Sequence, residues 1–263
     1  MVDLRDDEFY VGYLPRAPRG IAARVRWATA ALGLVAAAVA VLLVHGQRGF
    51  DPGTHEYGVV REFRGVIRER PYPLLQLPRP GRPDRAVADS ASDSTYYLTA
   101  RGKAGAAALV AGLDGRPVRL RGSLVHRDAL TMVEIAGEVE PLAGQAASEL
   151  EGLPAPPVAD LGERTLTGEI VDSKCFLGVM KPGHLKPHRD CAARCISGGI
   201  PPLLVVRDGE GRATSFLLVS AAGEPLGREV LPLVAEPVEI RGRVERVGEL
   251  LVLRADPGSY RRL

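Results

Sequence analysis

The longest apolar run of the chain extends from Trp27 to Val44 and contains no charged residue. As a helix it spans about 27 Å, close to the thickness of a bilayer core. A cleaved signal peptide is the alternative, but the run exceeds a usual signal-peptide core and no small-x-small cleavage site follows it. The pattern therefore predicts a transmembrane helix over residues 27–45 that stays in the chain.

Charge on either side of this run predicts its orientation. Four arginines precede it, whereas His45 and Arg48 follow it closely. By the positive-inside rule, residues 1–26 form a cytoplasmic tail and the rest of the chain is extracytoplasmic. We therefore expect a single-pass protein of the cytoplasmic (inner) membrane, with its C-terminal domains in the periplasm or an equivalent space.

Beyond the apolar run, a pattern of alternating apolar and polar residues occurs twice. Residues 116–135 match residues 236–255, and Gly122 corresponds to Gly242. In both segments apolar residues occupy every second position, which predicts a half-buried strand followed by a hairpin partner. The repeat indicates two copies of one small β domain.

Three further strands are predicted in each copy, with a short helix after the third. The segments are 61–67, 73–77, 96–100 and helix 103–111 in the first copy, and 165–171, 202–206, 215–219 and helix 227–235 in the second. Three strands, a helix and two strands follow each other as in a small OB-like barrel. We predict a mainly β fold in which the transmembrane helix precedes two tandem OB-like barrels, 56–139 without cysteine and 164–257. A Pro- and Ala-rich linker joins them over 140–163.

The second copy differs from the first by an insertion between its first two strands, at residues 173–199. It contains all three cysteines of the chain, together with His184 and His188. Because the first barrel lacks this segment, we expect the insertion to be a grafted functional site that contributes little to core packing.

The spacing within the insertion predicts a metal site. Pro187 suits the first turn of a helix that Gly198 and Gly199 would end. On that helix, the spacing of three and seven residues places His188, Cys191 and Cys195 on one face, and Cys175 lies where it can close the site. Four such ligands form a Cys3His set for one transition metal ion, zinc or copper. Two residues of the intervening loop, Met180 and His184, are additional candidate ligands.

A disulfide is the alternative interpretation of these cysteines. In an oxidising compartment, Cys175 could pair with Cys191 or Cys195 and leave one free thiol. Cys191 and Cys195 are poorly placed to pair with each other on one regular helix. Four cations of the insertion would favour the thiolate form that either chemistry needs, namely Lys174, Lys181, Arg189 and Arg194. Metal and disulfide both remain open from the sequence.

Composition and motifs argue against other functions. The net charge is +2 and aromatic residues make up only 5% of the chain, so stacking on nucleic acid is not expected even from OB-like barrels. The sequence has no recognisable Ser/His/Asp or paired-carboxylate arrangement and no Cys-x-x-Cys motif. We therefore expect a protein that is not an enzyme, and the sequence identifies no small-molecule substrate.

Two segments, GEIVDSKCFLGVMKPG and HRDCAARCISGGIPP, carry a resemblance to a group of bacterial proteins. They resemble a recurrent pattern in membrane-anchored envelope proteins with an OB-like β domain. The resemblance implies an envelope protein in which Cys175, His188, Cys191 and Cys195 form the shared site, and it implies no activity. Our expectation is a membrane-anchored metal-binding accessory or electron-transfer subunit of a membrane redox or respiratory complex, with protein partners there. The alternative is a non-redox scaffold protein with a structural zinc ion or disulfide.

Overall fold

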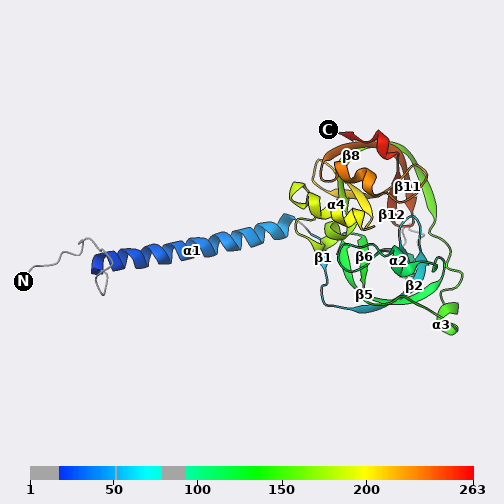
Figure 1. Cartoon of the computed structure of the whole chain (residues 1–263), viewed down its shortest axis with the longest axis horizontal. Coiled ribbons are helices and arrows are strands. Elements are labelled where there is room, and N and C mark those ends of the chain that lie inside the picture. Colours follow the sequence, from blue (N-terminus) through cyan, green and yellow to red (C-terminus); the bar gives the residue numbers. More distant parts are fainter. Residues whose placement is uncertain (1–17, 51, 79–92) are drawn as a thin grey trace, which may run out of the picture. The chain divides into compact units, whose positions relative to one another are not determined.

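The computed structural model of the protein describes residues 18–50, 52–78 and 93–263 (Figure 1). Most of the predicted cytoplasmic tail, residues 1–17, lies outside this range. The chain separates into two compact units, residues 1–50 and 51–263.

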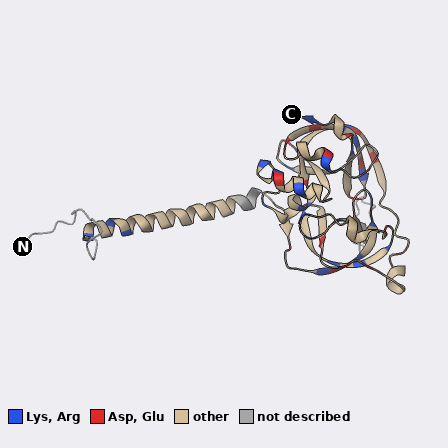
Figure 2. Ribbon diagram, viewed as in Figure 1, with Lys and Arg blue, Asp and Glu red and all other residues tan. Residues whose placement is uncertain are grey.

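The first unit contains one long helix, α1 (Arg19–Phe50). Residues Arg19–Gly46 have a mean hydropathy of 2.4, and this stretch could be a single membrane span or a signal sequence. The helix begins earlier than the predicted residue 27, since Pro18 suits a helix start and Ala22, Ala23 and Arg24 are good helix formers. Figure 2 shows basic residues near its start and an otherwise uncharged body.

The first barrel of the second unit closes from five strands in the OB order. These strands are β2 (Arg61–Arg68), β3 (Leu74–Pro78), β4 (Asp93–Thr99), β5 (Pro117–Arg127) and β6 (Leu130–Ile135). Each pairs with its neighbour in the order β2-β3-β4-β6-β5, and β5 pairs back to β2. The β4–β6 pair alone is parallel in this closed set. The predicted helix is present but shorter, as α2 (Ala107–Val110).

The second barrel repeats this arrangement. Its strands are β8 (Val158–Asp172), β9 (Pro202–Arg207), β10 (Ala213–Val219), β11 (Pro237–Val247) and β12 (Leu250–Arg254). They close in the order β8-β9-β10-β12-β11, and β10 and β12 are parallel. A short helical segment, η3 (Arg228–Leu233), takes the place of α2. The predicted fold of two OB-like barrels is therefore confirmed.

Short elements lie outside the two barrels. They are β1 (Thr54–His55), β7 (Glu140–Pro141), α3 (Gln145–Ser148), η4 (Pro257–Ser259) and β13 (Arg261–Arg262). The region predicted as a linker, 140–163, is only partly irregular, because β8 already begins at Val158. Its first residues pair with the far end of β11, where Val158 faces Val247. This long two-strand ribbon extends the sheet beyond the barrel.

The glycines shared by the two copies have one physical role. A Cβ atom at Gly65 would lie 2.5 Å from the Gln76 carbonyl oxygen, and one at Gly168 would lie 2.5 Å from the Val205 carbonyl oxygen. In both barrels the first strand therefore passes so close to the second that only glycine fits. The repeated glycines mark the bend by which each sheet closes.

The outer faces of the barrels pack against each other. A shared apolar cluster combines Tyr72, Leu74, Tyr97, Val125 and Met132 of the first barrel with Leu203, Val205, Leu217, Val219, Leu250 and Val252 of the second. Tyr72 also connects the barrels by hydrogen bonds, since its hydroxyl accepts from the Leu226 N–H at 2.7 Å and donates to the Leu218 carbonyl at 3.2 Å. We call this contact region the seam.

The insertion is part of the packed core, so the expectation that it would contribute little to packing is wrong. Phe176 and Leu177 are buried in the seam cluster. Ala192 and Ile196 are buried in the interior cluster of the second barrel. The first barrel contributes to the seam without any insertion. Its sequence therefore gave no sign that the second barrel uses its insertion for packing.

Candidate metal centre

Three short elements of the insertion carry the predicted ligands. Cys175 begins η1 (Cys175–Val179), a single wide helical turn that follows β8. His188 ends η2 (Lys186–His188), which contains Pro187 in its first turn. Cys191 and Cys195 lie one turn apart on α4 (Arg189–Ser197), and Gly198 caps that helix through bonds to the last carbonyls. The predicted helix and its two ends are therefore present.

The side chains of these elements converge. Ligand atoms of Cys175, His188 and Cys191 all lie within 4.8 Å of one another, and so do those of Asp172, Cys175 and Cys195. The two groups share Cys175, whose Sγ lies 3.9 Å from that of Cys191. The structure thus brings all four predicted ligands into one cluster, which we call the thiol cluster, and adds Asp172 to it.

Asp172, the last residue of β8, organises the cluster and was missed by the sequence analysis. It is fully buried. Its Oδ1 accepts a hydrogen bond from the Cys175 N–H at 2.9 Å, and its Oδ2 lies 3.0 Å from His188 Nε2. A carboxylate that holds one ring nitrogen fixes the orientation of the imidazole and leaves Nδ1 for a metal. The signal was in the sequence, since an acidic residue directly follows an apolar strand three positions before Cys175.

Burial is deep around most of the donors. Cys175, Cys195 and His188 are each 3% exposed or less, whereas Cys191 is partly exposed. A hydrogen bond with Cys195, together with burial, raises the pKa of the Cys175 thiol far above its usual value. The same hydrogen bond lowers the pKa of Cys195. Metal binding requires these thiols as thiolates, so it would release their protons.

A lysine of the first barrel completes the thiol cluster. Lys103 Nζ lies 2.7 Å from Cys191 Sγ and 3.9 Å from Cys195 Sγ. The hydrogen bond to Cys191 raises the pKa of this ammonium, so the group is held as a cation. Nothing in the sequence pattern connected residue 103 to residue 191, because the contact depends on how the two barrels pack.

Two of the four cations proposed from the sequence are committed to other partners. Lys174 is 2% exposed, and its Nζ lies 2.5 Å from Glu134 Oε2 in the first barrel. Arg189 donates to Glu236 Oε1 at 2.9 Å. Arg194 lies on the exposed side of α4, and Lys181 is exposed in the preceding loop. Lys103, by contrast, contacts two of the sulfurs directly.

The remaining candidates are Met180 and His184. Met180 is 44% exposed just after η1. His184 is buried, with its ring 6.4 Å from that of Phe176 in an edge-on arrangement. His184 does not belong to the two ligand groups found among the described residues. The three cysteines are all free thiols, so the structure holds no disulfide in any of the pairings considered.

The donor set fits a transition metal ion. Soft thiolates with one imidazole are the donors that zinc and copper prefer, and a nearby carboxylate orients the histidine. The structure shows that these groups could hold a metal ion. Among the described residues, the four predicted ligands are divided between two groups of three that share Cys175.

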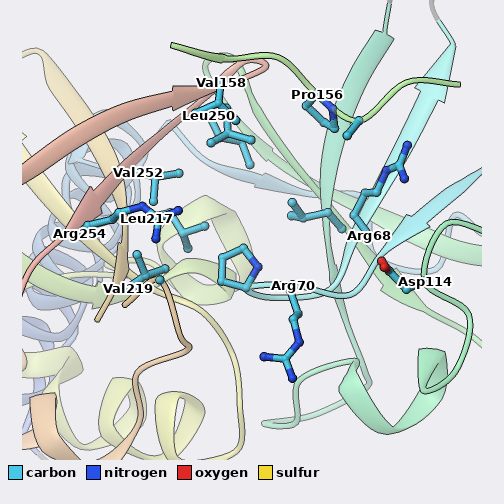
Figure 3. Close-up of a pocket in the computed structure, with 15 residues that line it drawn as sticks. Arg68, Arg70, Asp114, Pro156, Val158, Leu217, Val219, Leu250, Val252 and Arg254 are labelled. Carbon is cyan, nitrogen blue, oxygen red and sulfur yellow. The ribbon is translucent and has the colours of Figure 1, made fainter. Parts of the chain in front are cut away.

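Apart from the thiol cluster, a hollow lies at the seam between the two barrels (Figure 3). It has a volume of about 320 Å³ and aliphatic walls that include Leu217 and Val252. Its arginines are engaged by neighbours, since Arg68 Nε donates to Gln76 at 2.8 Å and Arg254 Nε to Glu245 at 2.7 Å. No Cys or His is among the described residues that line it.

Comparisons with known proteins add little to this geometry. No protein family model matches the chain, and no curated protein matches it. Among solved structures, the single-stranded DNA binding protein from Thermus aquaticus is similar over 81% of this chain and 88% of its own, at 12% identity and a TM-score of 0.18. So low a TM-score carries no argument about function, and the OB assignment rests on the strand order itself.

Proposed function

We propose that the protein is a membrane-anchored, extracytoplasmic metal-binding subunit that serves a membrane redox complex as an accessory or electron-transfer component. One transition metal ion, zinc or copper, would be held by Cys175, His188, Cys191 and Cys195. The observation that carries the proposal is the convergence of these donors from three separate elements into one buried cluster.

The barrel faces support a role in protein assembly over nucleic-acid binding. OB folds bind oligonucleotides on the face of their second and third strands. Here those strands are β3 and β4 in one barrel and β9 and β10 in the other, and both faces contribute side chains to the seam. The surface that would bind a nucleic acid is therefore used for contact between the barrels.

One observation favours a second candidate function, a non-redox scaffold with a structural metal ion. The insertion contacts both barrels, since Phe176 packs in the seam while Ile196 packs inside the second barrel. A closed zinc site at this point would stabilise the two-barrel unit without any redox change. Both candidates need the same ligands; a copper ion would favour electron transfer, whereas a zinc ion would favour the structural role.

Elemental analysis of the natively purified full-length protein tests the proposal. We expect about one equivalent of zinc or copper, and loss of this metal in Cys191→Ser and Cys195→Ser because each removes a thiolate ligand. Met180→Leu serves as the matched control and should keep the metal. Visible absorption then separates the two functions, because zinc sites are colourless and oxidised copper thiolates absorb strongly. Wild-type protein without stoichiometric metal would contradict both.

A further inference from the structure

We infer that Lys103 is the charge partner of the metal site and that the complete site therefore spans both barrels. The inference rests on the proposed metal binding and adds a residue that none of the ligand elements contains. All the donor atoms come from β8 and the insertion, in the second barrel. The ammonium that contacts them comes from the loop after β4, in the first barrel.

Charge explains why such a partner is needed. Three thiolates and the Asp172 carboxylate together carry four negative charges when a metal is bound, and a divalent ion offsets two of them. Burying the remainder is costly unless a cation lies close by. Lys103 offsets one further charge at 2.7 Å from Cys191 Sγ, where the cluster is partly open to solvent.

The loop that carries Lys103 is held in place by the insertion. The buried Lys174, next to Cys175, donates from its Nζ to the Ala100 carbonyl at 2.8 Å and to the Gly102 carbonyl at 2.7 Å. After Lys103, the Gly105 N–H donates to the Gly198 carbonyl at 2.8 Å, just beyond the end of α4. The chain segment that presents the thiols thus also fixes the backbone on both sides of Lys103.

This double anchoring distinguishes Lys103 from an ordinary surface lysine. A flexible four-carbon side chain normally keeps its ammonium in water, and an exposed ion pair stabilises a protein little. Here other hydrogen bonds already fix the backbone around Lys103. Only side-chain freedom is therefore lost when the ammonium contacts the sulfur. Lys103 acts as a positioning residue for the thiolates, and the metal site is incomplete in the second barrel alone.

The test is metal competition with a chromophoric chelator, using full-length protein in detergent. Partners outside the ligand shell change metal affinity by about 10–100-fold when removed, so we expect Lys103→Met to weaken zinc binding by about that factor. Lys103→Arg keeps the charge and should retain most of the affinity. Arg101→Met is the matched control, because Arg101 belongs to the same loop but lines a separate hollow with His55 and Tyr57. Zinc binding by Lys103→Met as tight as that of the wild type would overturn the inference.

A second measurement on metal-free protein keeps the inference testable if the wild type binds no metal. Thiolate is the form that iodoacetamide alkylates. Removing the ammonium that contacts Cys191 Sγ should slow alkylation of this residue in Lys103→Met, and Arg101→Met should leave the rate unchanged. Failure of wild-type metal binding would contradict the proposed function, whereas an unchanged alkylation rate would contradict the role of Lys103.

Discussion

Replacing Gly198 with alanine tests the contact between the insertion and the first barrel. Gly198 has a φ of −83°, which any residue adopts, so alanine causes no backbone strain of its own. A Cβ atom there would lie 1.9 Å from the Lys103 carbonyl oxygen, whereas ordinary contact begins at 3.4 Å. The two backbones must therefore separate by about 1.5 Å, the difference between these two distances.

The size of the effect follows from three contributions. Overpacking of this kind costs about 1–3 kcal/mol. The hydrogen bond from the Gly105 N–H to the Gly198 carbonyl would also be weakened, at a cost of about 1 kcal/mol. Alanine lowers the entropy of the unfolded chain, which stabilises the folded state by about 0.4–1 kcal/mol. We expect a net loss of about 1–3 kcal/mol in the free energy of unfolding, or roughly 2–12 °C in Tm for a unit of this size.

The assay is thermal unfolding of the full-length protein in detergent, followed by circular dichroism of its β signal. Gly209→Ala is the control, because a Cβ atom at Gly209 meets nothing within 4 Å. This variant should unfold within about 1 °C of the wild type, since surface substitutions change stability little. If Gly198→Ala unfolds at or above the wild-type temperature, the close contact between α4 and the loop of Lys103 is not present in the protein.

Three further predictions concern core, charge and topology. Phe176→Ala should destabilise the protein by about 3–5 kcal/mol in chemical denaturation, because it opens a cavity in the seam, while Phe176→Leu should cost less. Glu236 accepts from Lys186, which lowers its pKa, so its contribution to stability is present above about pH 4.5 and is lost as the pH falls toward the lowered value. In acid unfolding, the stability of Glu236→Gln should therefore lack the part that the wild type loses when Glu236 is protonated. Protease added to intact spheroplasts should digest residues 51–263, and protection of this unit would contradict the extracytoplasmic orientation.

The sequence was sufficient for the fold because the fold repeats. Alternation in 116–127 and 236–247 predicted strands that the structure contains as β5 and β11. Because of the duplication, an element that one copy indicates only weakly could be predicted from its counterpart in the other copy. The short helix after the third strand is an example. Boundaries were less certain, since β8 extends into the predicted linker through pairing with β11, and such pairing depends on a partner strand far away in sequence.

The site was only partly accessible from sequence. Helical periodicity placed His188, Cys191 and Cys195 on one face, and this is a local property that 3.6 residues per turn determines. The orienting role of Asp172 depends on where β8 ends relative to η2, which spacing alone does not define.

Lys103 and the packing of the insertion were decided by the tertiary structure alone. The contact between Lys103 and Cys191 joins residues 88 positions apart, in different barrels. Likewise, the Arg127 guanidinium of the first barrel lies over the Phe176 ring, with its Cζ atom 3.9 Å from the ring centre. Local periodicity determines which residues share a face of a strand or helix, and it therefore predicted both barrels and most of the thiol cluster. Which faces then meet depends on burying apolar surface between barrels, a non-local property that no single stretch of sequence encodes.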